Sequence, residues 1–286
     1  MFENLPVKIA EAVSLYQPVE TEGLVLHPIL VREYGLFSTA RPAIEFLQQS
    51  LPVRYLSVPL LSAYYGMDVE NLREGKPSDG LFSRALLFLV LALRYKPEEK
   101  PEERLRSFAS NILVDPEDQT VLKGIVFEMD GEEHKITPVQ FQRMRPILAA
   151  QNGIDLESDD ANPELVEAER DIAEQNAPEL DQNISALVSF VSALTGAEES
   201  VVYDWPILKL TRRRESFERI LAYLLYGFAS VNGAKFKGGN PVPSPIFPRK
   251  KTDSDALIDM AVFTKGQNVS VSQGGIPPET RFMNPT

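Results

Sequence analysis

Apolar positions in residues 1–110 recur mainly at helical spacing, with one short exception. Residues 81–94 are apolar on nearly every face, which indicates a helix buried at the centre of the N-terminal part. Leu24–His27, bounded by a glycine and a proline, predicts a short strand. Pro59 suits the first turn of another helix, which we expect to end at Gly66. The N-terminal part is therefore predicted to be helical with little strand.

After residue 110, the spacing of apolar residues changes to the alternation typical of strands. Asn111–Val114, Thr120–Met129 and Glu132–Ile136 are rich in Val, Ile and Phe. Asp130-Gly131 separates the last two runs, and Asp-Gly between extended runs is typical of a two-residue hairpin turn. Gly124 interrupts the alternation of the middle run and indicates a bulge. These features predict a small antiparallel meander.

Helical spacing returns after the meander. Thr137-Pro138 suits a helix start, with Thr as the cap and Pro at the first position, and we expect this helix to end at Gly153. Asn162-Pro163 repeats the start signal for a helix to about Asn176. The longest candidate helix follows Trp205-Pro206. Its apolar stripe, at helical spacing, consists of Phe217, Ile220, Leu221, Leu224 and Phe228.

The predicted fold class is α+β and predominantly helical. Residues 1–136 form a helical unit that includes the meander, and residues 137–237 form a second, helical unit. Residues 238–286 are rich in proline and glycine, so we expect an extended tail.

Composition narrows the classes of protein and partner. The 286 residues are 43% apolar, enough for a sizeable core, and carry a formal net charge of -12, which disfavours binding to nucleic acid. Cysteine is absent, which excludes disulfides, thiolate catalysis and zinc sites that use cysteine. We find no signal peptide and no apolar run long enough to span a bilayer, so we expect a cytoplasmic protein without a membrane partner.

No motif for catalysis, cofactor binding or metal binding withstands inspection. His27 and His134 lie in separate predicted elements, without a second histidine at helical spacing. The acidic run that begins at Asp155 resembles a calcium loop, but it has Asp160 where glycine is needed and Val166 where a bidentate glutamate is needed. Phosphate-binding glycine loops and a serine nucleophile elbow are also missing. We therefore expect a non-enzymatic protein without cofactors.

Charge is distributed unevenly. Residues 155–181 hold eleven acidic residues and one arginine, whereas residues 205–251 hold ten basic and two acidic residues. Such segments can pair within one chain or between copies. Arginine and tyrosine often dominate binding at interfaces, and the long helix places them opposite its apolar stripe. This candidate partner-contact face consists of Arg212, Arg219, Tyr223 and Tyr226. The alternatives are a solvated basic face, or phosphate binding by the basic region.

Three segments resemble proteins encoded near the tape-measure gene of tailed bacteriophages. Leu26–Tyr34 is similar to their opening strand and helix, and Ile136–Ile154 is similar to their middle helix with its Gln-Asn ending. Val231–Lys237 resembles their Gly-x-Lys-Phe-Lys segment, followed by Lys250-Lys251 and Ala256–Asp259. After this third segment the chain departs from the family pattern, because it carries a proline run in place of an aromatic helix.

The resemblance implies a non-enzymatic morphogenesis protein, namely a tail assembly chaperone in the host cytoplasm. Its partners would be the tape-measure and tube proteins, and it could also form a homo-oligomer. The alternative is a structural virion component of the neck, tail or baseplate, bound to other virion subunits and with its C-terminal tail ordered by its neighbours.

Overall fold

A computed structural model describes residues 5–157, 183–232 and 244–246, together with the single positions 164, 166 and 168. The chain divides into two compact units, Met1–Glu215 (unit 1) and Ser216–Thr286 (unit 2). Most of the predicted acidic helix to Asn176 and most of the tail lie outside the described residues.

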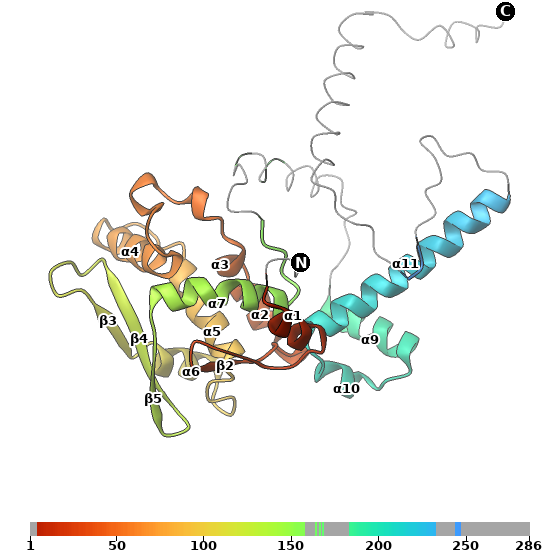
Figure 1. Ribbon diagram of the computed structural model, residues 1–286, viewed down its shortest axis with the longest axis horizontal. Coiled ribbons are helices and arrows are strands. Elements are labelled where there is room, and N and C mark those ends of the chain that lie inside the picture. Colours follow the sequence, from red (N-terminus) through yellow and green to blue (C-terminus); the bar gives the residue numbers. More distant parts are fainter. Residues whose placement is uncertain are drawn as a thin grey trace, which may run out of the picture. The chain divides into compact units, whose positions relative to one another are not determined.

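The structure is α+β and predominantly helical, as the sequence predicted (Figure 1). The helices of unit 1 are α1 (Val7–Ser14), α2 (Tyr34–Ala40), α3 (Pro42–Glu45), α4 (Leu60–Arg73), α5 (Leu81–Ala92), α6 (Pro101–Phe108), α7 (Pro138–Gln151), α9 (Ile184–Thr195) and α10 (Glu199–Tyr203). Short 3-10 turns are Val31–Glu33, Gln48–Ser50 and Val53–Tyr55. The long helix α11 (Ile207–Val231) starts in unit 1 and ends in unit 2.

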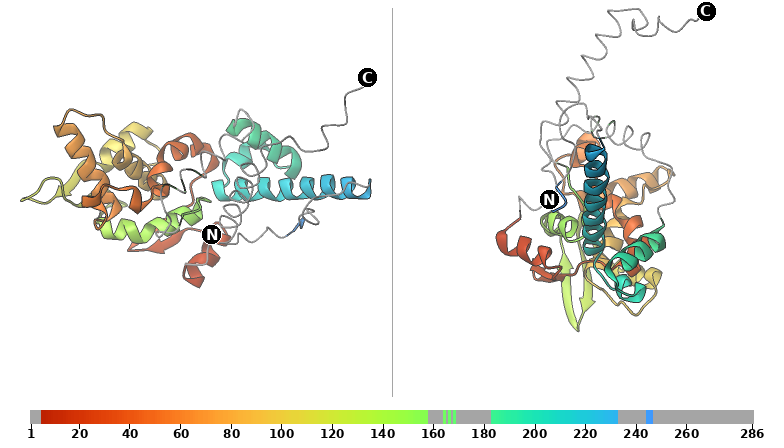
Figure 2. Two further views of the ribbon diagram at one scale, coloured as in Figure 1. Left: turned by 90° about the horizontal axis from the view of Figure 1, so that it is seen from above. Right: turned by 90° about the vertical axis from the view of Figure 1, so that its right-hand side faces the viewer.

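Two antiparallel sheets complete unit 1. One contains β1 (Val19–Thr21) and β2 (Leu24–Leu26), and the other contains β3 (Asn111–Val114), β4 (Leu122–Met129) and β5 (Glu132–Ile136), in that order. The three-stranded sheet and the α9–α10 pair lie at opposite ends of unit 1 (Figures 1 and 2).

The meander matches its prediction in detail. Met129 pairs with Glu132 across a two-residue turn in which Asp130 and Gly131 both have positive φ, 55° and 80°. Between β3 and β4 the register shifts where Gly124 lies, which is the predicted bulge. A side chain at Gly124 would place its Cβ 2.9 Å from Cε of Lys135, and the φ of 156° is one that other residues rarely adopt.

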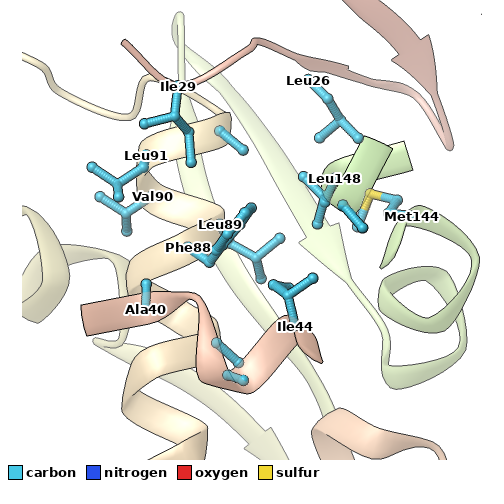
Figure 3. Packing of buried hydrophobic residues seen from close by; sticks show 14 of the residues in the cluster. Leu26, Ile29, Ala40, Ile44, Phe88, Leu89, Val90, Leu91, Met144 and Leu148 are labelled. Carbon is cyan, nitrogen blue, oxygen red and sulfur yellow. The ribbon is translucent and has the colours of Figure 1, made fainter. Parts of the chain in front are cut away.

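The core of unit 1 is built around α5. This helix contacts α2, α3, α4 and α6, and this explains why it is apolar on nearly every face. Phe88, Leu89, Val90 and Leu91 are four successive buried residues of α5. Figure 3 shows how side chains from other elements surround them, including Leu26, Ile29, Ala40, Ile44, Met144 and Leu148. The predicted central helix is confirmed.

Helix α7 joins this core rather than starting a separate body. Its N-terminus carries a capping box, in which Thr137 accepts from the Gln140 amide and the Gln140 side chain accepts from the Thr137 amide. The helix continues through Pro146 and packs against α3, α4 and β4. The predicted boundary at residues 136/137 therefore differs from the observed division, which falls between Glu215 and Ser216.

The prediction that α4 ends at Gly66 was wrong, because the helix runs on to Arg73. Gly66 is instead a point of close packing. A Cβ at this position would lie 2.8 Å from Oη and 2.9 Å from Cε1 of Tyr55, a buried residue. The glycine allows Tyr55 to pack directly against the helix backbone.

Two segments far apart in the sequence meet at the end of α7. Gln151 and Asn152 are buried, and the Gln151 Nε2 donates to the Leu26 carbonyl at 3.1 Å. The Ile29 amide donates to Oδ1 of Asn152 at 2.9 Å, and Nδ2 of Asn152 donates to the Leu148 carbonyl at 2.8 Å. These bonds satisfy buried backbone groups, so in this structure the Gln-Asn pair serves the fold.

Candidate partner-binding surface

The first turn of α11 is anchored in unit 1. Ile207, Leu208 and Leu210 are buried, and the Ile207 amide donates to the Ile29 carbonyl at 2.9 Å. The Lys209 ammonium lies 4.0 Å from the ring centroid of Trp205, where it forms a cation–π contact. This end of the helix is therefore part of the core.

The second half of α11 has a different environment. Leu225, Phe228 and Val231 are 70%, 74% and 88% exposed, and Ile220, Leu221 and Leu224 are also exposed. From Ile220 to Asn232 the sequence has no Asp, Glu, Lys or Arg. Such a concentration of exposed apolar side chains is unusual for a surface helix and is typical of interaction sites.

The predicted apolar stripe thus lies on a helix, as expected, but most of its residues are exposed rather than packed within the described residues. Five residues recur at alternating steps of four and three, the spacing that packs one helix along another. We call these residues the apolar seam: Phe217, Leu221, Leu224, Phe228 and Val231.

The predicted partner-contact face divides between the two units. Arg212 belongs to unit 1, where its Nη1 donates to the Ser14 carbonyl at 3.4 Å and its guanidinium lies 5.4 Å from the centroid of the Tyr16 ring. In unit 2, Nη2 of Arg219 donates to Oγ of Ser216 at 3.0 Å. Tyr223 and Tyr226 are 43% and 42% exposed. Arg219, Tyr223 and Tyr226, called the tyrosine face below, lie opposite the apolar seam.

A cleft of about 800 Å³ in unit 1 was not foreseen from the sequence. Its lining comes from the end of β2, the loop after α5, the end of α6 and the β4–β5 turn. Within it, Nζ of Lys96 donates to Oγ of Ser107 at 3.0 Å, a pairing that can activate a serine when the lysine is neutral. Interactions with Tyr95 and Glu99 raise the pKa of Lys96, so its ammonium is protonated near pH 7.

His27 also lines this cleft. Burial, and secondarily the positive charge of Arg94, lowers the pKa of His27, so the ring is neutral near pH 7. Its Nδ1 is buried and has no hydrogen-bond partner among the described residues. His134 lies elsewhere, stacked on Phe127 with ring centroids 5.7 Å apart. The two histidines therefore occupy different environments, and no acidic partner for either is evident in the described structure.

Within the described ranges, no group of three or more His, Cys, Asp or Glu residues is arranged to hold a metal ion. None of the helices described is both long and apolar enough to cross a membrane. A scan against protein-family models, a search of curated proteins and a search of solved structures each found no match to this chain.

Proposed function

We propose that this chain is a non-enzymatic morphogenesis protein of a tailed bacteriophage, and specifically a tail assembly chaperone that binds tape-measure and tube proteins. The resemblance of three sequence segments supplies the partners. The single structural observation that supports the proposal is the second half of α11, which exposes an apolar seam and, opposite it, the tyrosine face.

The tyrosine face suits recognition of another protein. Tyrosine offers a large rigid ring and a hydroxyl at little cost in conformational entropy, and arginine adds a planar cation. Tyr223 and Tyr226 lie three residues apart, so their rings are on adjacent turns of the same face. Arg219 lies one turn before Tyr223 and extends this surface.

The test uses the full chain and the tape-measure protein of the same phage. The double variant Tyr223→Ala/Tyr226→Ala should bind a tape-measure fragment about tenfold or more weakly, because tyrosine is enriched among the interface residues whose truncation costs about 2 kcal/mol or more. The matched control is Leu72→Ala, which removes another exposed side chain, from α4. Unchanged binding by the tyrosine variant, or no binding by the unmodified chain, would contradict the proposal.

Mass spectrometry of purified virions addresses the assembly role separately. A chaperone leaves before maturation, so we expect the chain in lysates and its absence from finished particles. Stoichiometric copies in the particles would instead support the alternative, a structural virion component.

A further inference from the structure

We infer that the cleft of unit 1 binds an extended peptide segment of a partner protein, which adds as a strand to the free edge of β4. The peptide lies antiparallel to β4, in line with β3, and carries an acidic side chain that pairs with Arg94. The inference concerns unit 1 alone and goes beyond the proposed function, which rests on the second half of α11.

Strand β4 extends past its neighbour β3. Asn111, the first residue of β3, pairs with Val126, so Phe127, Glu128 and Met129 have no strand partner on this edge within the described residues. These three residues line the cleft. A free strand edge presents backbone donors and acceptors at the spacing that another extended chain needs. The cleft therefore lies where a further strand segment can join the sheet.

The backbone of Glu128 faces this free edge. Met129 and Glu132 flank the two-residue turn, and such a pair exchanges both backbone hydrogen bonds across the hairpin. Because the direction of the backbone groups alternates along a strand, the amide and carbonyl of Glu128 point away from β5 and towards the cleft. Neither group bonds to a loop or turn backbone of the described structure. A peptide residue opposite Glu128 can therefore form two hydrogen bonds.

The outer edges of this sheet have features that discourage pairing with another chain. Strand β5 has charged side chains at Glu132, Glu133 and Lys135, and β3 is only four residues long, with a register shift after Leu113. Charges, short length and bulges are common protections of edge strands. The free edge of β4 instead borders a cleft of about 800 Å³, a volume within the range of ligand-binding pockets.

The charges of the cleft favour a peptide with an acidic side chain. The Lys96 ammonium already forms an ion pair with Glu99 at 3.4 Å. The exposed Arg94 guanidinium has no ion pair or hydrogen bond among the described residues, and Arg94 has a φ of 51°, a strained conformation of the kind that binding sites retain. The other charged lining residues are Glu98, Glu128 and Asp130. A segment of mixed charge therefore suits the cleft better than a simple anion such as phosphate.

The test starts with a displayed library of short random peptides, selected on the full chain. Selection should yield peptides with an acidic residue that bind Glu128→Pro about tenfold or more weakly, because proline removes the amide hydrogen and its ring obstructs the edge. The matched control is Glu133→Pro, which changes the residue opposite Glu128 at the outer edge of β5 and should leave binding unchanged. No enriched peptide, or enriched peptides that all bind Glu128→Pro as tightly as the unmodified chain, would overturn the inference.

Amide hydrogen exchange followed by NMR tests the strand contact without a substitution. A selected peptide should slow the exchange of the Glu128 amide, whereas the amides of Phe127 and Met129, which face β5, should change little. Unchanged exchange at Glu128 would contradict strand addition. This measurement decides the point even if Glu128→Pro does not fold.

The role of Arg94 is tested with the same peptide. Arg94→Gln should weaken binding by up to about fivefold, the range of an exposed ion pair. Replacing the acidic residue of the peptide by its amide should cost the same factor with the unmodified chain and nothing further with Arg94→Gln. An equal loss with both chains would show that the acidic side chain does not pair with Arg94.

Discussion

Arg94 occupies a backbone position that proteins usually give to glycine. It follows α5 with a φ of 51°, its amide donates to the Leu91 carbonyl, and the Tyr95 amide donates to the Val90 carbonyl. These two bonds form the Schellman pattern that ends many helices. A non-glycine residue in this conformation costs about 1 kcal/mol. This position places the Arg94 guanidinium at the cleft, beside His27.

The charge of Arg94 should be measurable through His27. Arg94→Gln removes the positive charge that helps to lower the pKa of His27, so this pKa should rise towards 6.5 without reaching it, because burial is the larger cause. Titration of the His27 ring followed by NMR, in the unmodified chain and in the variant, measures this change in pKa. An unchanged His27 curve would show that Arg94 does not act on the ring.

The same shift gives stability a pH dependence. The pKa of His27 is lower in the folded chain than its ordinary value of 6.5, so the unfolded chain binds the proton more readily. The contribution of His27 to stability is therefore complete above pH 6.5 and is lost as the pH falls through the folded pKa. Arg94→Gln should make this loss smaller, which urea denaturation at pH 7.5 and pH 5.5 can measure.

Residue chemistry was predictable only where the relevant partner is near in sequence. The Thr137 cap and the Asp130-Gly131 turn depend on residues within three positions, and both were predicted. The Asn152 side chain, in contrast, satisfies the amide of Ile29, a residue 123 positions away. Only the fold brings these two groups together, so the sequence showed a helix ending and not its role.

At the scale of elements, Gly66 shows how packing overrides local propensity. Glycine weakens a helix, and for this reason the sequence predicted that α4 ends at Gly66. The helix continues beyond this glycine because one face of α4 is buried. Likewise, β1 was not predicted, because its turn has Glu22 with a φ of 51° at a position where Asn, Asp or Gly is usual. For both α4 and β1, packing against the rest of unit 1 decides the structure, and local sequence propensity does not.

Gly66→Ala should destabilise unit 1 although alanine is the better helix former. The propensity gain is at most about 1 kcal/mol, while the clash with Tyr55 costs about 1–3 kcal/mol, so we expect a net loss near 1 kcal/mol. Urea denaturation measures the difference. In a Tyr55→Ala background the contact with that ring is absent and only the Thr120 carbonyl stays close, at 3.1 Å from the added Cβ, so the same substitution should cost less. Equal losses in both backgrounds would contradict this account.

At the scale of the whole molecule, the spacing of apolar residues along a helix and the exposure of those residues proved to be separate properties. The spacing of Phe217 to Phe228 predicted the helix and its apolar stripe, but spacing does not tell whether the fold covers that stripe. The predicted contact face had a similar outcome, since Arg212 is used within unit 1 while Tyr223 and Tyr226 are exposed. The sequence therefore indicated the candidate helix without showing which of its residues are exposed.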